Sequence, residues 1–148
     1  MGLFKITHKR AGLVLKKYQC HNEFTTSGLE RVIRQFFTTF TIFPPSTEIG
    51  LIDSTVTDIS DTGSIHPGWD EILLVPRGTW VQDTPAAASN PYSHTGTAIL
   101  TAGGTAAAKG VFLINSLLLF ATAIFPATID LQENDTLEIG YTLTITGL

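Results

Sequence analysis

The C-terminal part of the chain carries the clearest structural signal in the sequence. Apolar side chains recur at every second position after Thr136, namely Leu137, Ile139, Tyr141, Leu143 and Ile145. The residues between them are Glu138, Gly140, Thr142, Thr144 and Thr146. Successive side chains of a β-strand point to opposite faces, so this alternation predicts a strand with one buried and one polar face.

Further strands are predicted at intervals of roughly ten residues, separated by turn-forming residues. Their ranges are 12–20, 47–52, 69–75, 92–100, 106–114 and 117–124. This spacing favours a mainly β fold, either an antiparallel β-sandwich or a jelly-roll-like barrel.

One short α-helix is predicted near the N-terminus, over about residues 27–38. Its apolar residues follow the three-and-four spacing of one helix face: Leu29, Val32, Ile33, Phe36, Phe37 and Phe40. Ser27 and Glu30 are spaced as a capping box, in which each side chain accepts a hydrogen bond from the other residue's backbone amide. Pro44 and Pro45 exclude a longer helix.

The 148 residues suffice for one domain. We expect residues 1–21 to form a basic N-terminal arm with the first strand, and residues 22–148 to form a single β-sandwich domain. Residues 53–68 are predicted to be a long polar loop and residues 85–91 a linker or loop.

The chain is poor in charge. Charged residues make up 15% of it, against about 25% in a typical soluble domain, and hydrophobic residues make up 43%. A covered surface would explain this shortage, which favours permanent assembly with copies of the chain or with a larger scaffold. The alternative is a threonine-rich surface, since the 22 threonines can replace charge on exposed strand faces.

The basic residues of the N-terminal arm precede the first acidic residue, Glu23. They are Lys5, Lys9, Arg10, Lys16 and Lys17. Such an arm can contact an acidic protein surface, or its lysines can protect an exposed edge strand from stray pairing. The five charges are spread over thirteen positions, so no compact nucleic-acid patch is predicted.

No pattern of catalytic or metal-binding residues is apparent, so we expect a non-enzymatic protein without a cofactor or metal. The four histidines lack metal-ligand spacing, the single cysteine, Cys20, has no identifiable base, and no serine lies in a G-x-S-x-G motif. Asp53, Asp58 and Asp61 are interpreted as solvated loop carboxylates rather than an acid–base pair.

Membrane insertion and secretion are not predicted either. The apolar run over 111–127 is interrupted by polar residues and is shorter than the roughly 20 residues that cross a bilayer. The N-terminus lacks the features of a signal peptide, which predicts synthesis in the cytoplasm.

The two tryptophans, Trp69 and Trp80, have two possible roles. They can anchor the core or an interface, where a large ring buries much area. Alternatively, they can stack on a sugar, as in a carbohydrate-binding β-sandwich.

Several segments, in this order, resemble a group of small tailed-phage virion structural proteins. The segments are "NEFTTSGLERVIRQFF", "IGLID", "HPGWDE", "AKGVFLIN" and "ENDTLEIGYTLTITG", from about Asn22 to the end of the chain. The positions that match are Gly50, Leu51, Ile52, Asp53, His66, Gly68, Trp69, Lys109, Gly110, Phe112, Asp135, Leu137, Tyr141, Thr142 and Leu143. The sequence departs from the group at Asn134, where a glycine is usual, and between Pro76 and Pro91.

The resemblance implies a structural protein of the phage particle. By analogy of fold it suggests a capsid cement or decoration protein, which forms a trimer on the head surface and braces the shell by binding the major capsid protein. The basic arm would then contact the capsid. A tail, fibre or baseplate module, and a glycan-binding β-sandwich, are the alternatives.

Overall fold

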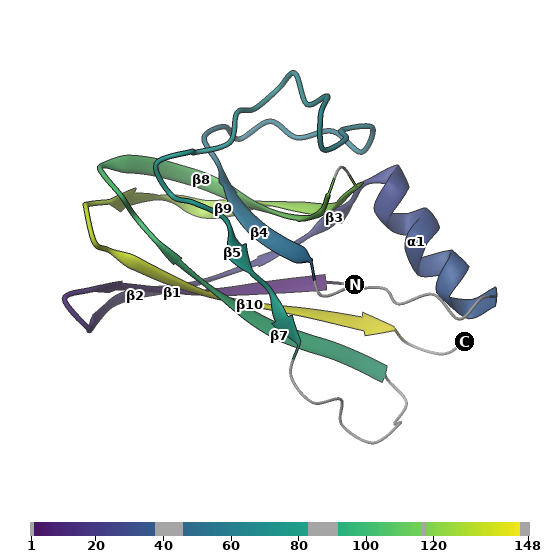
Figure 1. The fold of residues 1–148 in the computed structure, drawn as a ribbon, viewed down its shortest axis with the longest axis horizontal. Helices are drawn as coiled ribbons and strands as arrows, with labels where there is room; N and C mark the ends of the chain where they lie inside the picture. Colours follow the sequence, from purple (N-terminus) through teal and green to yellow (C-terminus); the bar gives the residue numbers. More distant parts are fainter. Residues whose placement is uncertain (1, 38–45, 83–91, 117, 146–148) are drawn as a thin grey trace.

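The computed structural model describes residues 2–37, 46–82, 92–116 and 118–145. Within these ranges the chain is mainly β and forms two antiparallel sheets of five strands each, packed as a β-sandwich (Figure 1). The predicted fold class is confirmed.

The first sheet has the strand order β2-β1-β10-β7-β6. Its strands are β1 (Gly2–Arg10), β2 (Leu13–His21), β6 (Val81–Gln82), β7 (Tyr92–Thr101) and β10 (Thr136–Ile145). β10 lies in the middle of this sheet, between β1 and β7, which accounts for its regular alternation of buried and polar residues.

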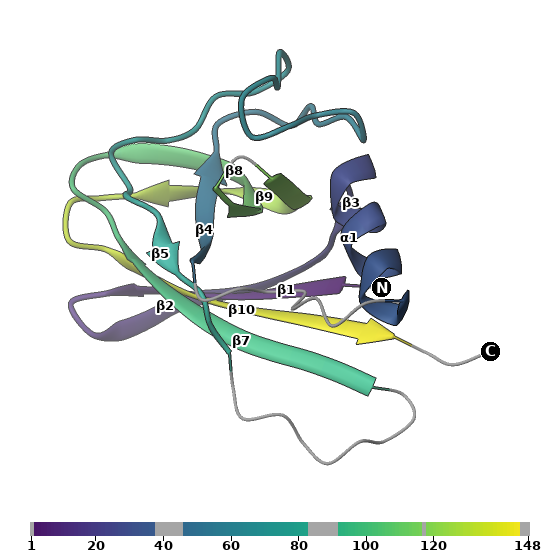
Figure 2. The ribbon, with the colours of Figure 1, turned by 45° about the vertical axis from the view of Figure 1, so that its right-hand side comes forward.

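The second sheet has the strand order β3-β9-β8-β4-β5. Its strands are β3 (Glu23–Phe24), β4 (Thr47–Ile52), β5 (Gly78–Thr79), β8 (Ala106–Asn115) and β9 (Leu118–Leu131). Figure 2 shows the two sheets as layers, with the helix α1 (Thr26–Phe37) at one end of the sandwich.

Trp80 lies where the chain passes from one sheet to the other. β5 pairs with β4 in the second sheet, and β6, which follows directly, pairs with β7 in the first. The Trp80 amide donates to the carbonyl oxygen of Thr47 over 2.9 Å, and the residue is buried in the main core. This tryptophan therefore anchors the core.

The helix begins one residue before the predicted start and ends one residue before the predicted end. Its cap differs from the prediction: Thr25 Oγ1 accepts the amide of Gly28 over 3.1 Å, so Thr25 caps the helix in place of the Ser27–Glu30 box. Leu29, expected on the buried face, is half exposed, whereas Val32 packs against the core. Phe40 lies outside the described residues.

Strand β10 confirms the prediction from alternation, since Leu137, Ile139, Tyr141 and Leu143 are all buried between the sheets. Strand β8 behaves differently, because residues 110–114 are buried on both faces. Phe112 and Ile114 point away from the main core and form a second apolar cluster with Trp69 under the loop of residues 53–77. That long loop serves to cover the outer face of the second sheet.

Two segments differ from the sequence prediction. Residues 2–10, expected to be an arm, form β1, whose Phe4 and Ile6 belong to the core. Residues 69–75, expected to be a strand, form turns with a single β-bridge between Ile52 and Glu71. Their apolar residues are divided between burial, as at Val75, and exposure, as at Leu73. The predicted linker at 85–91 lies outside the described residues.

Candidate functional site

The basic N-terminal segment is a β-hairpin made of β1 and β2. Its turn residues, Ala11 and Gly12, both have positive φ, 48° and 79°, as in the type I′ turns that connect twisted antiparallel strands. The pairing register shifts between His8 and Lys9, just before the turn. The segment is thus an ordered part of the first sheet, and β2 is an edge strand of that sheet.

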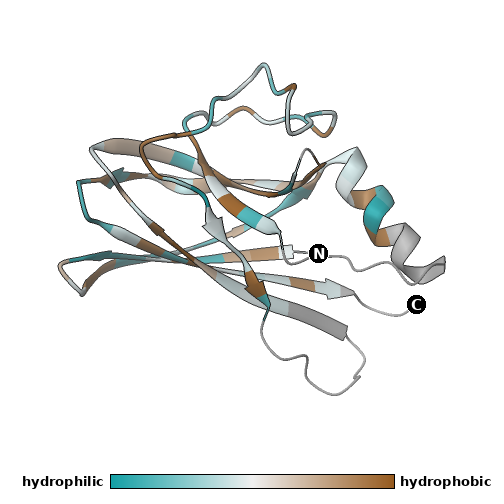
Figure 3. Ribbon diagram, in the orientation of Figure 1, coloured by the Kyte–Doolittle hydropathy of each residue, from teal (hydrophilic) through white to brown (hydrophobic). Residues whose placement is uncertain are grey.

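Three consecutive apolar residues are exposed just after the turn. Leu13, Val14 and Leu15 are 71%, 52% and 49% exposed. Lys16 and Lys17 follow directly and are also exposed. Residues 13–17 are called the basic tip below. In Figure 3 this tip places brown apolar residues next to teal lysines at the end of the hairpin. Three exposed apolar side chains in a row favour contact with another molecule.

The five predicted contact residues are divided by the structure into two groups. Lys9 pairs with Glu138 over 2.8 Å, and Arg10 pairs with Asp135 over 2.8 Å, so both serve contacts within the fold. Lys5, Lys16 and Lys17 are exposed and form no ion pair with the described residues. The latter group is therefore the more open to a partner.

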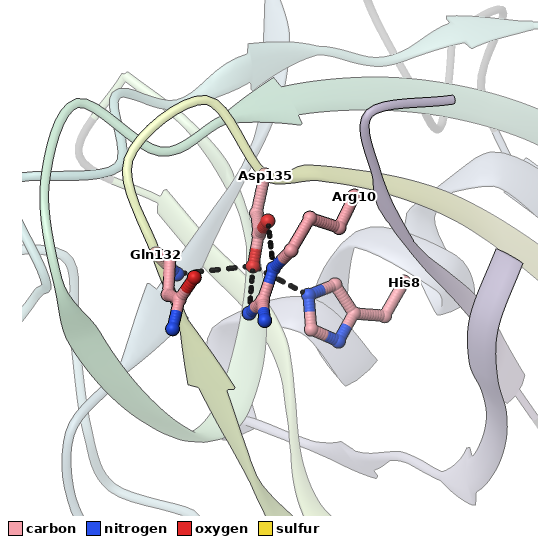
Figure 4. Close-up of polar contacts among 4 residues, drawn as sticks. All are labelled: His8, Arg10, Gln132 and Asp135. Carbon is pink, nitrogen blue, oxygen red and sulfur yellow. Dashed lines mark hydrogen bonds and ion pairs between the residues drawn. The ribbon is translucent and has the colours of Figure 1, made fainter. Parts of the chain in front are cut away.

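Asp135 fastens the tip end of the hairpin to the turn between β9 and β10 (Figure 4). Its carboxylate accepts Nε and Nη2 of Arg10 over 2.8 Å each, and contacts Nε2 of His8 over 2.8 Å. The amide of Gln132 donates to it over 3.0 Å. The Asp135 side chain is fully buried, and its pKa is held well below the usual range, chiefly by the Arg10 hydrogen bonds.

The sequence does not predict the role of Asp135. This residue is one of the positions that match the resemblance, and nothing in the local sequence links it to His8 or Arg10. A buried His–Asp pair also occurs in hydrolytic enzymes, but His8 is only 5% exposed and its ring lies inside the fold. The arrangement acts as a structural anchor for the hairpin.

Trp69 organises the loop of residues 53–77. Its Nε1–H donates to Asp61 Oδ2 over 2.8 Å, and the His66 ring stacks on it with ring centroids 3.9 Å apart. Trp69 and Trp80 are 5% and 3% exposed. Both are core residues, and neither presents a ring face on which a sugar could stack.

Arg77 fixes the end of this loop. Its Nε and Nη2 donate to the two carboxylate oxygens of Glu71 over 2.7 Å each. Its guanidinium carbon lies 5.3 Å from the centroid of the Phe112 ring. Together with Trp69, Arg77 borders a cavity of about 350 Å³ on the outer face of the second sheet, and the polar groups Arg77 and Glu71 at its edge already bind each other.

Residues 53–74, called the acidic loop below, combine negative charge with exposed apolar side chains. Asp53, Asp58 and Asp70 are exposed. The exposed apolar residues are Val56, Ile59, Ile65, Leu73 and Leu74. In Figure 3 brown residues recur along this loop, between β4 and β5.

The loop carboxylates are bound to loop groups instead of forming an acid–base pair. Asp53 accepts the amide of Asp70 over 2.8 Å, and Asp58 accepts the amide and hydroxyl of Ser60 over 2.8 and 2.6 Å. The Ser60 hydrogen bonds lower the pKa of Asp58. Asp61, expected to be solvated, is instead buried against Trp69.

The remaining candidates for chemistry are not assembled into a site. Cys20 is buried, and burial raises the pKa of its thiol to about 11, which disfavours the reactive thiolate. Within the described ranges, no three His, Cys, Asp or Glu side chains are placed to hold a metal ion. None of the described helical residues belongs to a helix long and apolar enough to span a membrane.

Comparison of the chain with protein-family models, with curated proteins and with solved structures finds no match. The resemblance to small phage virion proteins therefore stays a prediction.

Proposed function

We propose that the chain is a non-enzymatic structural protein that self-associates and braces a larger particle. The observation that carries this proposal is the basic tip. A β-sandwich that presents three exposed apolar residues beside two lysines, on a hairpin anchored by a partly buried ion pair, suits a protein whose task is to make contacts.

The resemblance to tailed-phage virion proteins supports a specific form of the proposal. In this form the chain is a capsid cement protein that binds the major capsid protein on the phage head, as a trimer. The exposed Lys5, Lys16 and Lys17 would lie against an acidic surface of the capsid or of a neighbouring copy of the chain, because complementary charges guide and orient docking.

Two alternative functions differ from the capsid cement role. One differs in its place in the particle, and the other in the binding site that it needs. A tail, fibre or baseplate module would share the same surface but occupy another place in the particle. A glycan-binding module that stacks sugars on Trp69 or Trp80 is disfavoured, because both rings are buried.

The first test is the mass of the purified chain in solution, measured by size-exclusion chromatography with light scattering. We expect a multiple of the 16.0 kDa chain mass, and a mass of 16.0 kDa at all concentrations would contradict self-association.

The second test uses particles of the phage that encodes the chain. Particles that lack it should release their DNA at a lower temperature, measured with a DNA-binding dye, and adding the purified chain back should restore the original temperature. Unchanged release would contradict the cement role. Immuno-electron microscopy of intact particles would then show whether the chain lies on the tail.

A further inference from the structure

The two surfaces described above have opposite charge. Residues 2–21 contain five Lys and Arg and no Asp or Glu, whereas the acidic loop, residues 53–74, contains five Asp and Glu and no Lys or Arg. Internal contacts occupy part of each set, namely Lys9 and Arg10 in the hairpin and Asp61 and Glu71 in the loop. What remains exposed is cationic at the tip and anionic on the loop.

Both surfaces also expose apolar side chains. The basic tip projects Leu13, which is 71% exposed, and the acidic loop contains Ile65, which is 68% exposed. The loop surrounds a hollow of about 490 Å³, lined by residues that include Val56, Asp58, Ile65 and Pro67. A projecting apolar tip with lysines beside it matches a hollow that combines apolar walls with carboxylates.

The two surfaces cannot reach each other within one chain. The hairpin tip lies at the far end of the first sheet, and the acidic loop lies over the outer face of the second sheet, in both views of the molecule (Figures 1 and 2). Each surface therefore needs a second molecule, and every copy of the chain carries the complement of both.

We infer that the basic tip of one copy docks into the acidic loop of the next copy. Leu13 enters the hollow beside Val56 and Ile65, and Lys16 and Lys17, which point to opposite faces of β2, lie against loop carboxylates on either side of the tip. The anchor at Asp135 holds the hairpin in place before docking, which lowers the entropy lost on association.

An interface between two different surfaces of the same chain is heterologous. Such contacts produce a closed ring when the rotation between copies closes, and a ring of three copies would be a trimer. This inference rests on the self-association proposed above and names the surfaces that produce it.

The test uses two variants that each damage one surface. The tip variant is Leu13→Ser with Lys17→Glu, and the loop variant is Ile65→Ser with Asp70→Lys; all four side chains are exposed. The matched control is Ile99→Ser with Lys109→Glu, which changes an exposed apolar residue and a partly exposed lysine outside both surfaces. Circular dichroism checks that each variant is folded.

Light scattering measures the mass of each variant and of their equimolar mixture. The inference predicts that the tip and loop variants are each monomers of 16.0 kDa and that the control assembles as the wild type does. The mixture should form a 1:1 dimer and nothing larger, because one intact tip and one intact loop remain in it. Rising salt concentration should weaken this dimer.

Any other set of masses contradicts the inference, and the masses show which part of it is wrong. If the tip variant and the loop variant both assemble as the wild type does, this interface is excluded. It is also excluded if the mixture of the two variants stays monomeric. In either case self-association would use another surface. A monomeric wild type excludes self-association and this interface together. DNA release from particles lacking the chain then tests the cement role independently.

Discussion

Arg10 and Asp135 lie 125 positions apart in the chain and are joined by two hydrogen bonds of 2.8 Å, Nε to Oδ1 and Nη2 to Oδ2. The pair connects the tip end of the first hairpin with the turn before β10. Because the Asp135 side chain is fully buried, its charge depends on these donors and on His8 and Gln132 for compensation. The geometry of the basic tip therefore depends on a contact that is distant in sequence.

Replacing Asp135 with asparagine should destabilise the fold. The substitution removes the ion pair and leaves the buried His8 ring and the Arg10 guanidinium without a negatively charged acceptor. We therefore expect the free energy of unfolding to fall by about 3 kcal/mol. Urea denaturation at pH 7 measures this loss of stability.

The matched control is Glu138→Gln, which breaks the Lys9–Glu138 pair, whose side chains are 33% and 46% exposed. This surface pair should contribute less than about 1 kcal/mol. Equal losses in the two variants would contradict a structural role specific to Asp135.

The same carboxylate predicts a loss of stability in acid. Its pKa is lowered in the folded chain, mainly by the Arg10 hydrogen bonds, whereas in the unfolded chain it has the ordinary value of about 3.9. The unfolded state therefore takes up the proton first, so the contribution of Asp135 is fully present above about pH 4 and is lost as the pH falls towards the native pKa. Urea denaturation over a pH series should show the gap between wild type and Asp135→Asn narrowing below about pH 4. A gap that is constant with pH would contradict this assignment.

The sequence predicted the elements whose pattern is local. β10 has one face in the core and one face outside, and its alternation is visible without knowing its partners. β4, β7 and β8 were predicted within a residue of their observed bounds, because turn-forming residues border them. β1 was interpreted as an arm because of its lysines, although Phe4 and Ile6 alternate with Lys5 and Thr7 as a strand requires.

Other features depend on tertiary contacts that a local pattern does not contain. Residues 69–75 are apolar because they cover the second sheet from outside, and the same composition would fit a strand. The Arg10–Asp135 contact follows from the pairing of β1 with β10, which places the start of β10 beside the end of β1. The same register determines that Lys9 and Arg10 form ion pairs within the fold, whereas the other three basic residues of the hairpin stay exposed.

Cys20 should react slowly with thiol reagents in the folded chain. Burial raises the pKa of its thiol to about 11 from 9.0, so the thiolate fraction at pH 8 falls by about 100-fold, and burial also limits access. Reaction with 5,5′-dithiobis(2-nitrobenzoate) at pH 8 measures the rate, which should rise strongly in denaturant. The matched control is Cys20→Ala with Gln19→Cys, which moves the thiol to the neighbouring exposed position. A native Cys20 that reacts as fast as this control would contradict the burial of β2 against the second sheet.

Two glycines on paired strands should respond differently to alanine. Gly96 in β7 faces the core, and a Cβ there would overlap the Trp80 ring and lie 2.5 Å from the carbonyl oxygen of Val81. Gly140 in β10 faces outward, and the nearest atom to its Cβ would be the Lys5 carbonyl oxygen at 3.8 Å.

Overpacking against a buried indole and a backbone atom should make the Gly96→Ala variant about 2 kcal/mol less stable than the wild type. Gly140→Ala should change stability by less than about 0.5 kcal/mol. Thermal and urea unfolding measure both variants. Equal stability of the two would mean that the indole of Trp80 does not fill the space over Gly96, and the passage of the chain between the sheets at Trp80 would need to be revised.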